Sequence, residues 1–268
     1  MNEKTVKISP VWIWGPPLIF SLLAGVIFIF GWNRQLFLMV NGLSSYTGDT
    51  LWSVLTFFSD GLVSFVILFP LILRKPRWIW AVLIAAVLFA VFGQTIKHLA
   101  QVPRPPKVLS PQDFHVIGPA WGHYSFPSGH SSTAFNLAGV FALTTPRKWL
   151  RFLLIGAAVM AASSRMVVGV HWPVDVLAGA AFGWVTIWAG LRLADHSAWG
   201  WTGWGQKILG AVLLAASVTL FFVNHTGHSG IMGFQRAVAV VFFVWGGYKY
   251  IQVWERPKKK EPVHHKQD

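Results

Sequence analysis

The chain has 268 residues, of which 54% are hydrophobic and only 12% are charged. Soluble domains carry about 25% charged residues, so the composition excludes an ordinary soluble protein and indicates one embedded in a lipid bilayer. The formal net charge is +13 and the chain contains no cysteine, which excludes disulfides, thiol catalysis and cysteine metal sites.

The positive charge lies in short clusters that separate apolar runs. These clusters are Arg74, Lys75 and Arg77; Arg147, Lys148 and Arg151; Arg192 and Lys207; and the lysine-rich stretch 256–260. No soluble domain gathers the basic residues as nucleic-acid binding would require, so we expect no nucleic-acid partner. Alternation from Lys4 and Lys7 puts every cluster on one side of the membrane, as the positive-inside bias requires. Both termini are therefore expected in the cytoplasm.

Apolar runs close to the length of a membrane span, about 20 residues, recur along the chain. We expect eight spans, at 12–31, 60–74, 78–96, 128–145, 152–170, 173–191, 206–223 and 231–250. The first is interpreted as an uncleaved anchor because no small-residue cleavage site follows it. In the second, Asp60 is expected to be the helix N-cap, with the segment 35–58 lying partly along the surface.

This pattern predicts an all-α protein, a polytopic transmembrane helix bundle with a six-span core plus two additional C-terminal spans. We divide it into four parts. They are the N-terminal tail and first membrane anchor (1–32), the core (33–195), the additional pair of spans (196–254) and a basic, disordered tail (255–268). The longest loop, about 97–126, faces outward by the same alternation, and loops of this length are usually functional or disordered.

Three polar segments lie at the outer ends of spans, at 97–105, 126–130 and 164–175. Together they offer three permanent cations and two histidines: Lys97, Arg104, Arg165, His130 and His171. The acids near them are Asp113 and Asp175, too few to pair every cation. Unpaired charge at a membrane is costly, so we expect the cations to bind an anion from outside. Phosphate is the natural candidate, because arginine binds its oxygens through two N–H groups and lysine acts as a point charge.

The second segment is interpreted as the start of a helix. Pro127 suits the first helical position, which would place Ser128, Gly129 and His130 in the first turn. Backbone N–H groups there have no intrahelical partner and face an anion together with the helix dipole. We therefore expect Ser128 and Gly129 to bind the substrate phosphate, together with Lys97, Arg104 and Arg165.

The third segment contains a second helix start, marked by Pro173. His171 then lies just before the helix, and Asp175 in the first turn can reach back toward it. A hydrogen bond to Asp175 would fix the tautomer of His171, leave its other nitrogen free to attack, and stabilise the positive ring that attack creates.

These residues predict a mechanism that uses neither metal nor other cofactor. His171 is the expected nucleophile and would form a phosphohistidine. Protonated His130 would act as general acid toward the leaving oxygen and then as base toward water. Acids are scarce and cysteine is absent, so the sequence offers no plausible metal cage.

The three segments resemble the type-2 phosphatidate phosphatase superfamily, whose signature is Lys-x6-Arg-Pro, then Pro-Ser-Gly-His, then Ser-Arg-x5-His-x3-Asp. Every signature position is present: Lys97, Arg104, Pro105, Pro127, Ser128, Gly129, His130, Ser164, Arg165, His171 and Asp175. The resemblance covers residues 33–195 and implies an all-helical core with an outward-facing site and the roles assigned above. Similarity to bacterial members implies a cytoplasmic (inner) membrane location with a periplasmic or extracellular site. Members often have six spans, so the resemblance assigns no role to 196–254.

Other candidate residues have plainer interpretations. His98 lies outside the signature and is interpreted as structural. His115 and His123, in the outer loop, are expected at its surface, and Asp113 is expected to be solvent-exposed. His225 and His228 form a short outward pair that lacks a third ligand, so we expect no metal there.

The favoured function is hydrolysis of a lipid phosphate or diphosphate. Undecaprenyl diphosphate and phosphatidylglycerol phosphate are the substrates that bacterial members suggest. A phosphotransferase could use the same phosphohistidine with a lipid or sugar acceptor. A vanadate-dependent haloperoxidase shares the signature, but such proteins are soluble. A lipid transporter without catalysis is a further alternative, although transporters usually have charges or broken helices at mid-bilayer.

Overall fold

The computed structural model describes residues 8–119 and 124–255. Within these ranges the chain forms helices and no strand. The first half contains α1 (Pro10–Ile29), α2 (Asn33–Asn41), α3 (Ser44–Thr47), α4 (Asp49–Phe57), α5 (Gly61–Leu68), η1 (Phe69–Leu71), α6 (Pro76–Leu88), η2 (Phe89–Gly93), α7 (Gln94–Ala100) and α8 (Pro105–Val108). The second half contains α9 (Gly129–Ala142), α10 (Lys148–Val167), α11 (Pro173–His196), η3 (Ala198–Trp201), α12 (Gly203–Phe222), η4 (Ser229–Ile231) and α13 (Met232–Glu255).

The helices form the predicted multi-pass membrane bundle, but with fewer full-length spans than the eight expected. Six helical segments among the described residues are long and apolar enough to cross a membrane, or seven if α4 and α5–η1, bent by 63°, count as one. The expected span at 128–145 is the 14-residue helix α9, about 21 Å long at 1.5 Å per residue. The helix ends at Ala142. Pro146 follows shortly after, and helices usually end at or before the residue that precedes a proline.

Two predictions about local structure have clear outcomes. Asp60 is the N-cap of α5, as expected, and its carboxylate accepts the backbone N–H groups of Leu62 and Val63. The uncharged run 78–96 is helical throughout, but it is not a regular α-helix, because Phe89–Gly93 forms a π-helical turn. Such turns inside helices occur frequently near functional sites.

Helix α11 lies at the centre of the bundle and packs against α1, α6 and α9. Small residues allow this packing. A Cβ atom on Gly179 would lie 2.3 Å from the carbonyl oxygen of Ser128, and one on Gly183 would lie 2.3 Å from that of Ser132. The backbones of α9 and α11 therefore touch directly, which fixes the start of α9 against the start of α11.

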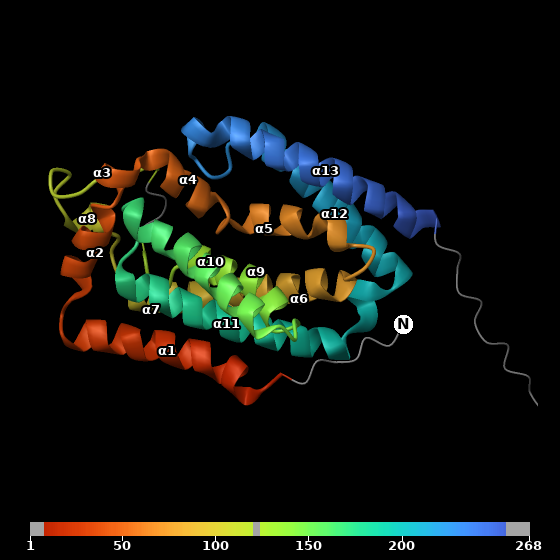
Figure 1. The fold of residues 1–268 in the computed structure, drawn as a ribbon, viewed down its shortest axis with the longest axis horizontal. Helices are drawn as coiled ribbons and strands as arrows, with labels where there is room; N and C mark the ends of the chain where they lie inside the picture. Colours follow the sequence, from red (N-terminus) through yellow and green to blue (C-terminus); the bar gives the residue numbers. More distant parts are fainter. Residues whose placement is uncertain (1–7, 120–123, 256–268) are drawn as a thin grey trace, which may run out of the picture.

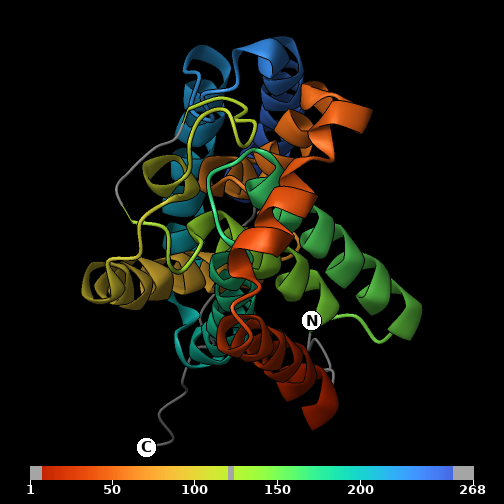
Figure 2. The same ribbon diagram turned by 90° about the vertical axis from the view of Figure 1, so that its left-hand side faces the viewer.

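The connections between helices gather at two opposite ends of the bundle (Figure 1). At one end lie α2, α3, α8 and the α10–α11 and α12–α13 connections. At the other lie the η1–α6, α9–α10 and α11–α12 connections. The basic clusters lie in or beside the first two, and Arg192 and Lys207 lie in the last turns of α11 and the first turns of α12. Figure 2 looks onto the first end, where the loops from the three polar segments converge.

Some predictions concern residues that the structure does not describe. Lys4, Lys7 and His123 are among them. The predicted disordered tail 255–268 also lies outside the described residues, apart from Glu255, which ends α13.

Candidate active site

The connection between α10 and α11 presents His171. Gly169 has a φ of +83°, a left-handed conformation that glycine adopts without strain, and it turns the chain between the two helices. Trp172 is the N-cap of α11 and Pro173 opens the helix, as predicted. Oδ2 of Asp175 accepts the backbone N–H of Trp172 at 2.8 Å. The same oxygen lies 3.4 Å from Nδ1 of His171, so the expected histidine–carboxylate pair is present.

Arg104 contacts the opposite nitrogen of His171. Its Nη1 lies 3.1 Å from Nε2 of the ring and donates to the carbonyl oxygen of Val170 at 2.9 Å. A guanidinium group only donates hydrogen bonds, so Nε2 is the acceptor and the ring proton lies on Nδ1, facing Asp175. The nitrogen with the free lone pair is therefore the one beside the cation that would hold a phosphate.

The ring of His171 is kept neutral by its surroundings. It is only 1% exposed. Burial, followed by the charges of Arg104, Arg165 and Lys97, lowers its pKa well below the ordinary value of 6.5. A neutral imidazole carries the lone pair that nucleophilic attack needs, so the site holds His171 in its reactive form at neutral pH.

The three cations of the sequence analysis converge around this ring with unused hydrogen-bonding capacity. The Nε atoms of Arg104 and Arg165 are buried, and neither has a partner among the described residues. Arg165, 6% exposed, donates to the hydroxyl of Thr56, and Nζ of Lys97 lies 3.4 Å from the carbonyl oxygen of Tyr124.

In the described part of the chain, these three cations form no ion pair with an acid. Burial also lowers the pKa of Arg104. Buried cations without acidic partners are stabilised by a bound anion. Its negative charge would balance theirs, and its oxygens would accept from the N–H groups that have no partner.

The start of α9 differs in one respect from the prediction. The helix begins at Gly129, and Ser128 is its N-cap, accepting the N–H of Ser131. The N–H of Ser128 donates to the carbonyl oxygen of Asp175 at 3.0 Å. Ser128 therefore links α9 to α11 and does not offer its N–H to an anion. The first-turn N–H groups of Gly129 and His130 remain suited to that role, because a helix start gives them no intrahelical partner.

The acids near the site include one that was not expected there. Asp113 lies 3.7 Å from Arg34, and both side chains are about half exposed or more, in agreement with its predicted solvent exposure. Asp60, predicted only as a helix cap, brings a carboxylate to the catalytic end. Its Oδ2 lies 3.0 Å from Nδ1 of His225. The sequence signal was the interruption of an apolar run by Ser59-Asp60-Gly61.

Sequence reasoning also missed two asparagines that hold the catalytic loops. The amide of Asn41, 2% exposed, donates to the carbonyl oxygens of His115 and Val167 at 2.8 Å, and its oxygen accepts the N–H of His115. Oδ1 of Asn33 accepts the N–H of Val174 at 3.1 Å. Both residues lie in α2, outside the signature, where nothing in the sequence marked them.

The remaining candidate histidines keep ordinary environments. Nε2 of His115 lies 2.9 Å from Asp49, with both side chains just over half exposed, as expected of a loop-surface residue. The ring of His98 packs edge-on against Tyr124, in keeping with the structural role predicted for it.

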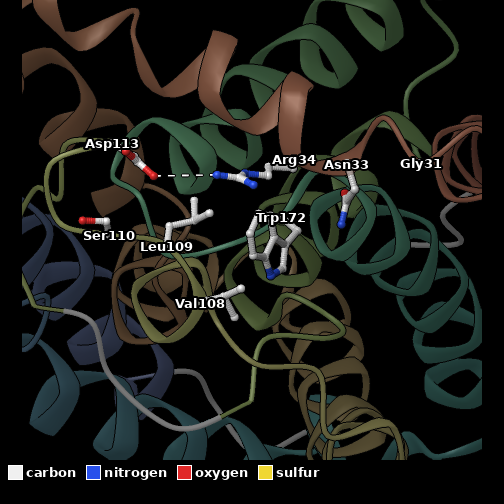
Figure 3. Close-up of a pocket in the computed structure, with 8 residues that line it drawn as sticks. All are labelled: Gly31, Asn33, Arg34, Val108, Leu109, Ser110, Asp113 and Trp172. Carbon is white, nitrogen blue, oxygen red and sulfur yellow. Dashed lines mark ion pairs between the residues drawn. The ribbon is translucent and has the colours of Figure 1, made fainter.

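An open cavity of about 340 Å³ lies beside the catalytic loop (Figure 3). It is lined by Gly31, Asn33, Arg34, Val108, Leu109, Ser110, Asp113 and Trp172. Trp172, the residue that follows His171, lines this cavity, and its indole N–H donates to the carbonyl oxygen of Pro103 at 2.8 Å. Lys97, Arg104 and Arg165 do not line this cavity, so it is distinct from the site where they would bind a phosphate.

Comparison with known proteins decides the family. The model of the PAP2 superfamily matches residues 78–199, which include all three polar segments. An undecaprenyl-diphosphatase from Sulfolobus acidocaldarius is 33% identical over 159 residues, which cover 58% of this chain and 76% of that protein. The chain belongs to the PAP2 superfamily. PAP2 members are phosphatases, so the chain is an enzyme of this class, and the transporter alternative falls away.

Two further PAP2 relatives agree with this assignment. A lipid A 1-phosphatase from Rhizobium etli is 35% identical over 150 residues, covering 51% of this chain and 62% of that protein. The crystal structure of LpxE from Aquifex aeolicus matches with a TM-score of 0.54 and 27% identity, covering 60% of this chain and 94% of that one. The all-helical membrane fold expected from the sequence is thereby confirmed.

Proposed function

We propose that this PAP2 protein removes phosphate from a lipid phosphate or diphosphate, with His171 as nucleophile and without a metal ion. The arrangement of His171 carries the proposal. Its ring lies between Asp175, at 3.4 Å from Nδ1, and Arg104, at 3.1 Å from Nε2. One nitrogen of this nucleophile faces a carboxylate, and the other lies beside cations without acidic partners. This arrangement fits in-line attack on a phosphate.

In the first step Nε2 of His171 forms a bond to phosphorus while the bond from phosphorus to the leaving oxygen breaks. The phosphate displaces Nη1 of Arg104 from Nε2 and takes the guanidinium as its own partner. Asp175 stabilises the positive ring of the phosphohistidine through Nδ1–H. Lys97, Arg165 and the first-turn N–H groups of α9 neutralise the transferring oxygens.

His130 supplies and recovers the proton. It lies in the first turn of α9 and interacts electrostatically with both Arg165 and His171. Its protonated ring gives a proton to the leaving oxygen in the first step. In the second step a water attacks phosphorus, the phosphorus–nitrogen bond breaks and His130 takes a proton from that water.

An apolar cleft of about 270 Å³ supports a lipid substrate. Its walls come from α1, α2, α9, α10 and α11. It reaches Met166, next to Arg165, and Pro173, two residues from His171. A hydrocarbon tail held there would lie among the membrane helices with its phosphate toward the cations. Relatives named for undecaprenyl diphosphate and lipid A support substrates of this kind, and phosphatidylglycerol phosphate remains a further candidate.

We propose that the site faces away from the cytoplasm. The catalytic loops lie at the end of the bundle opposite the one where the basic clusters lie (Figure 1). Basic loops stay on the cytoplasmic side, which supports a site on the outer face of a bacterial inner membrane.

Phosphate release by purified protein in detergent micelles, with a chelator present, tests the proposal. The substrates are undecaprenyl diphosphate, phosphatidylglycerol phosphate and lipid A, and His171→Ala is the control. We expect release by the wild type that collapses in the variant. Equal release by both would contradict the role of His171, and loss of wild-type release in chelator would contradict the metal-free reaction. Release only after addition of a lipid or sugar acceptor would favour the phosphotransferase.

A further inference from the structure

Helices α12 and α13 follow the region that the PAP2 model matches, which ends at residue 199. Their connection nevertheless lies at the catalytic end of the bundle (Figure 2). It carries two histidines that the mechanism does not use, His225 and His228. The ring of His228 lies so close to Gly118 that a Cβ atom there would be 2.7 Å away. The hairpin therefore reaches the outer loop of the site.

The connection is held firmly by hydrogen bonds. Nε2 of Gln235, a fully buried residue, donates to the carbonyl oxygens of Leu220 and Val223 at 2.7 Å. His228 is 6% exposed, with its Nδ1 3.3 Å from the hydroxyl of Ser53. Such satisfied buried groups keep a loop in one geometry, so His225 has a fixed position relative to the core.

His225 forms an ion pair with Asp60. Its Nδ1 lies 3.0 Å from Oδ2 of Asp60, across 165 residues of sequence. The carboxylate is only 6% exposed, whereas the ring of His225 is 45% exposed. The other carboxylate oxygen accepts backbone N–H groups at the start of α5. Asp60 is thus fixed by the core on one side and by the hairpin on the other.

Two contacts bring Asp60 toward His130: helix α5 packs against α9, and Thr56, four residues before Asp60, accepts a hydrogen bond from Arg165. Burial disfavours a positive ring on His130, and so do the charges of Arg165, Arg104 and protonated His225. Asp60 opposes these effects, because its negative charge stabilises the protonated ring that a general acid needs.

We propose that Asp60 and His225 form a positioning pair for the general acid of this site. The negative charge of Asp60 stabilises protonated His130, and the protonation state of His225 sets how strongly that charge acts on His130. The inference rests on the proposed function, in which His130 protonates the leaving oxygen. It assigns the α12–α13 hairpin a part in catalysis.

The pair makes the reaction respond to pH through His225. Its hydrogen bond to Asp60 raises the pKa of His225 above its ordinary 6.5, against the opposing effect of burial. Protonated His225 neutralises Asp60 and repels a proton on His130. When His225 loses its proton as pH rises, the charge of Asp60 becomes available to His130, and the general acid stays protonated to higher pH.

Two substitutions separate the parts of the pair. Asp60→Asn keeps the helix cap, because asparagine caps as well as aspartate, and removes the charge together with the oxygen that faces His225. His225→Gln keeps a hydrogen-bond donor and removes the titration. Asp49→Asn and His115→Gln alter a second histidine–aspartate pair of the same end, 2.9 Å apart and exposed, and serve as matched controls.

The measurement is kcat against pH for the wild type and the four variants, with one lipid monophosphate and one lipid diphosphate in micelles. We expect Asp60→Asn to lower kcat about tenfold or more on the monophosphate, whose alkoxide leaving group needs the acid, and less than about threefold on the diphosphate. The alkaline limb of kcat should move down by about one pH unit in Asp60→Asn and up by about half a unit in His225→Gln. The controls should match the wild type.

The outcomes separate this inference from the proposed function. If the wild type releases phosphate, His171→Ala does not, and Asp60→Asn leaves both kcat and its alkaline limb unchanged, the positioning pair is refuted alone. Equal losses of kcat on the monophosphate and the diphosphate would also refute it. So would alkaline limbs that move in the same direction in Asp60→Asn and His225→Gln, since a purely structural role produces both results. If wild type and His171→Ala do not differ, the proposed function fails first.

Discussion

Replacing Asp175 by asparagine isolates the carboxylate behind the nucleophile. The substitution keeps the shape of the side chain and an oxygen that can accept the N–H of Trp172, now 2.8 Å from Oδ2. It removes the negative charge 3.4 Å from Nδ1 of His171, and with it the stabilisation of the positive phosphohistidine. In Ser-His-Asp enzymes the equivalent loss of the carboxylate lowers kcat by about 10⁴-fold. The distance of 3.4 Å marks a weaker hydrogen bond.

We therefore expect Asp175→Asn to lower kcat by about 10²- to 10⁴-fold, or about 3 to 5 kcal/mol at 1.36 kcal/mol per tenfold. KM should change far less, because Arg104, Lys97 and Arg165 still bind the phosphate. The assay is initial-rate phosphate release in micelles, with Asp113→Asn as a control for loss of an exposed acid. A kcat within about threefold of wild type, in folded protein, would refute the role given to Asp175.

Three further substitutions test the site and its frame. Arg104→Gln should lower kcat/KM about 10²- to 10³-fold. Because Arg104 helps to lower the pKa of His171, the acid limb of the kcat/KM profile should also move to higher pH, and an unmoved limb would contradict this. Gly179→Ala places a methyl group 2.3 Å from the carbonyl oxygen of Ser128 and should destabilise the protein by about 1–3 kcal/mol, seen as a lower Tm in detergent, and an unchanged Tm would show that the helices adjust. Asn41→Ala leaves buried backbone groups unsatisfied and should cost about 1–3 kcal/mol; a melting curve equal to that of wild type would exclude the clamp.

Local patterns in the sequence predicted the parts of the site that local structure determines. Pro173 before an acid at the third helical position fixed both the start of α11 and the pairing of His171 with Asp175. Asp60 before an apolar run marked the start of α5. Each of these inferences needed only residues within a few positions of one another, where backbone geometry limits what side chains can reach.

Contacts between distant parts of the chain could not be predicted in this way. The pair of Asp60 and His225 depends on how the α12–α13 hairpin packs against α5, and hydropathy does not encode that packing. The hydrogen bond that occupies the N–H of Ser128 arises because α9 and α11 touch at Gly179.

The phosphoenzyme itself is the most direct test of His171 as nucleophile. Protein mixed with a lipid substrate labelled in its phosphate is quenched with base within milliseconds, since phosphohistidine survives base and decays in acid, and the peptides are analysed by mass spectrometry. With a lipid diphosphate, whose leaving group needs little help from an acid, we expect a phosphate on the peptide that contains His171, more of it in His130→Ala because water attack is slowed, and none in His171→Ala. Rapid phosphate release with no adduct in any of these proteins, or an adduct on another residue, would contradict nucleophilic catalysis by His171.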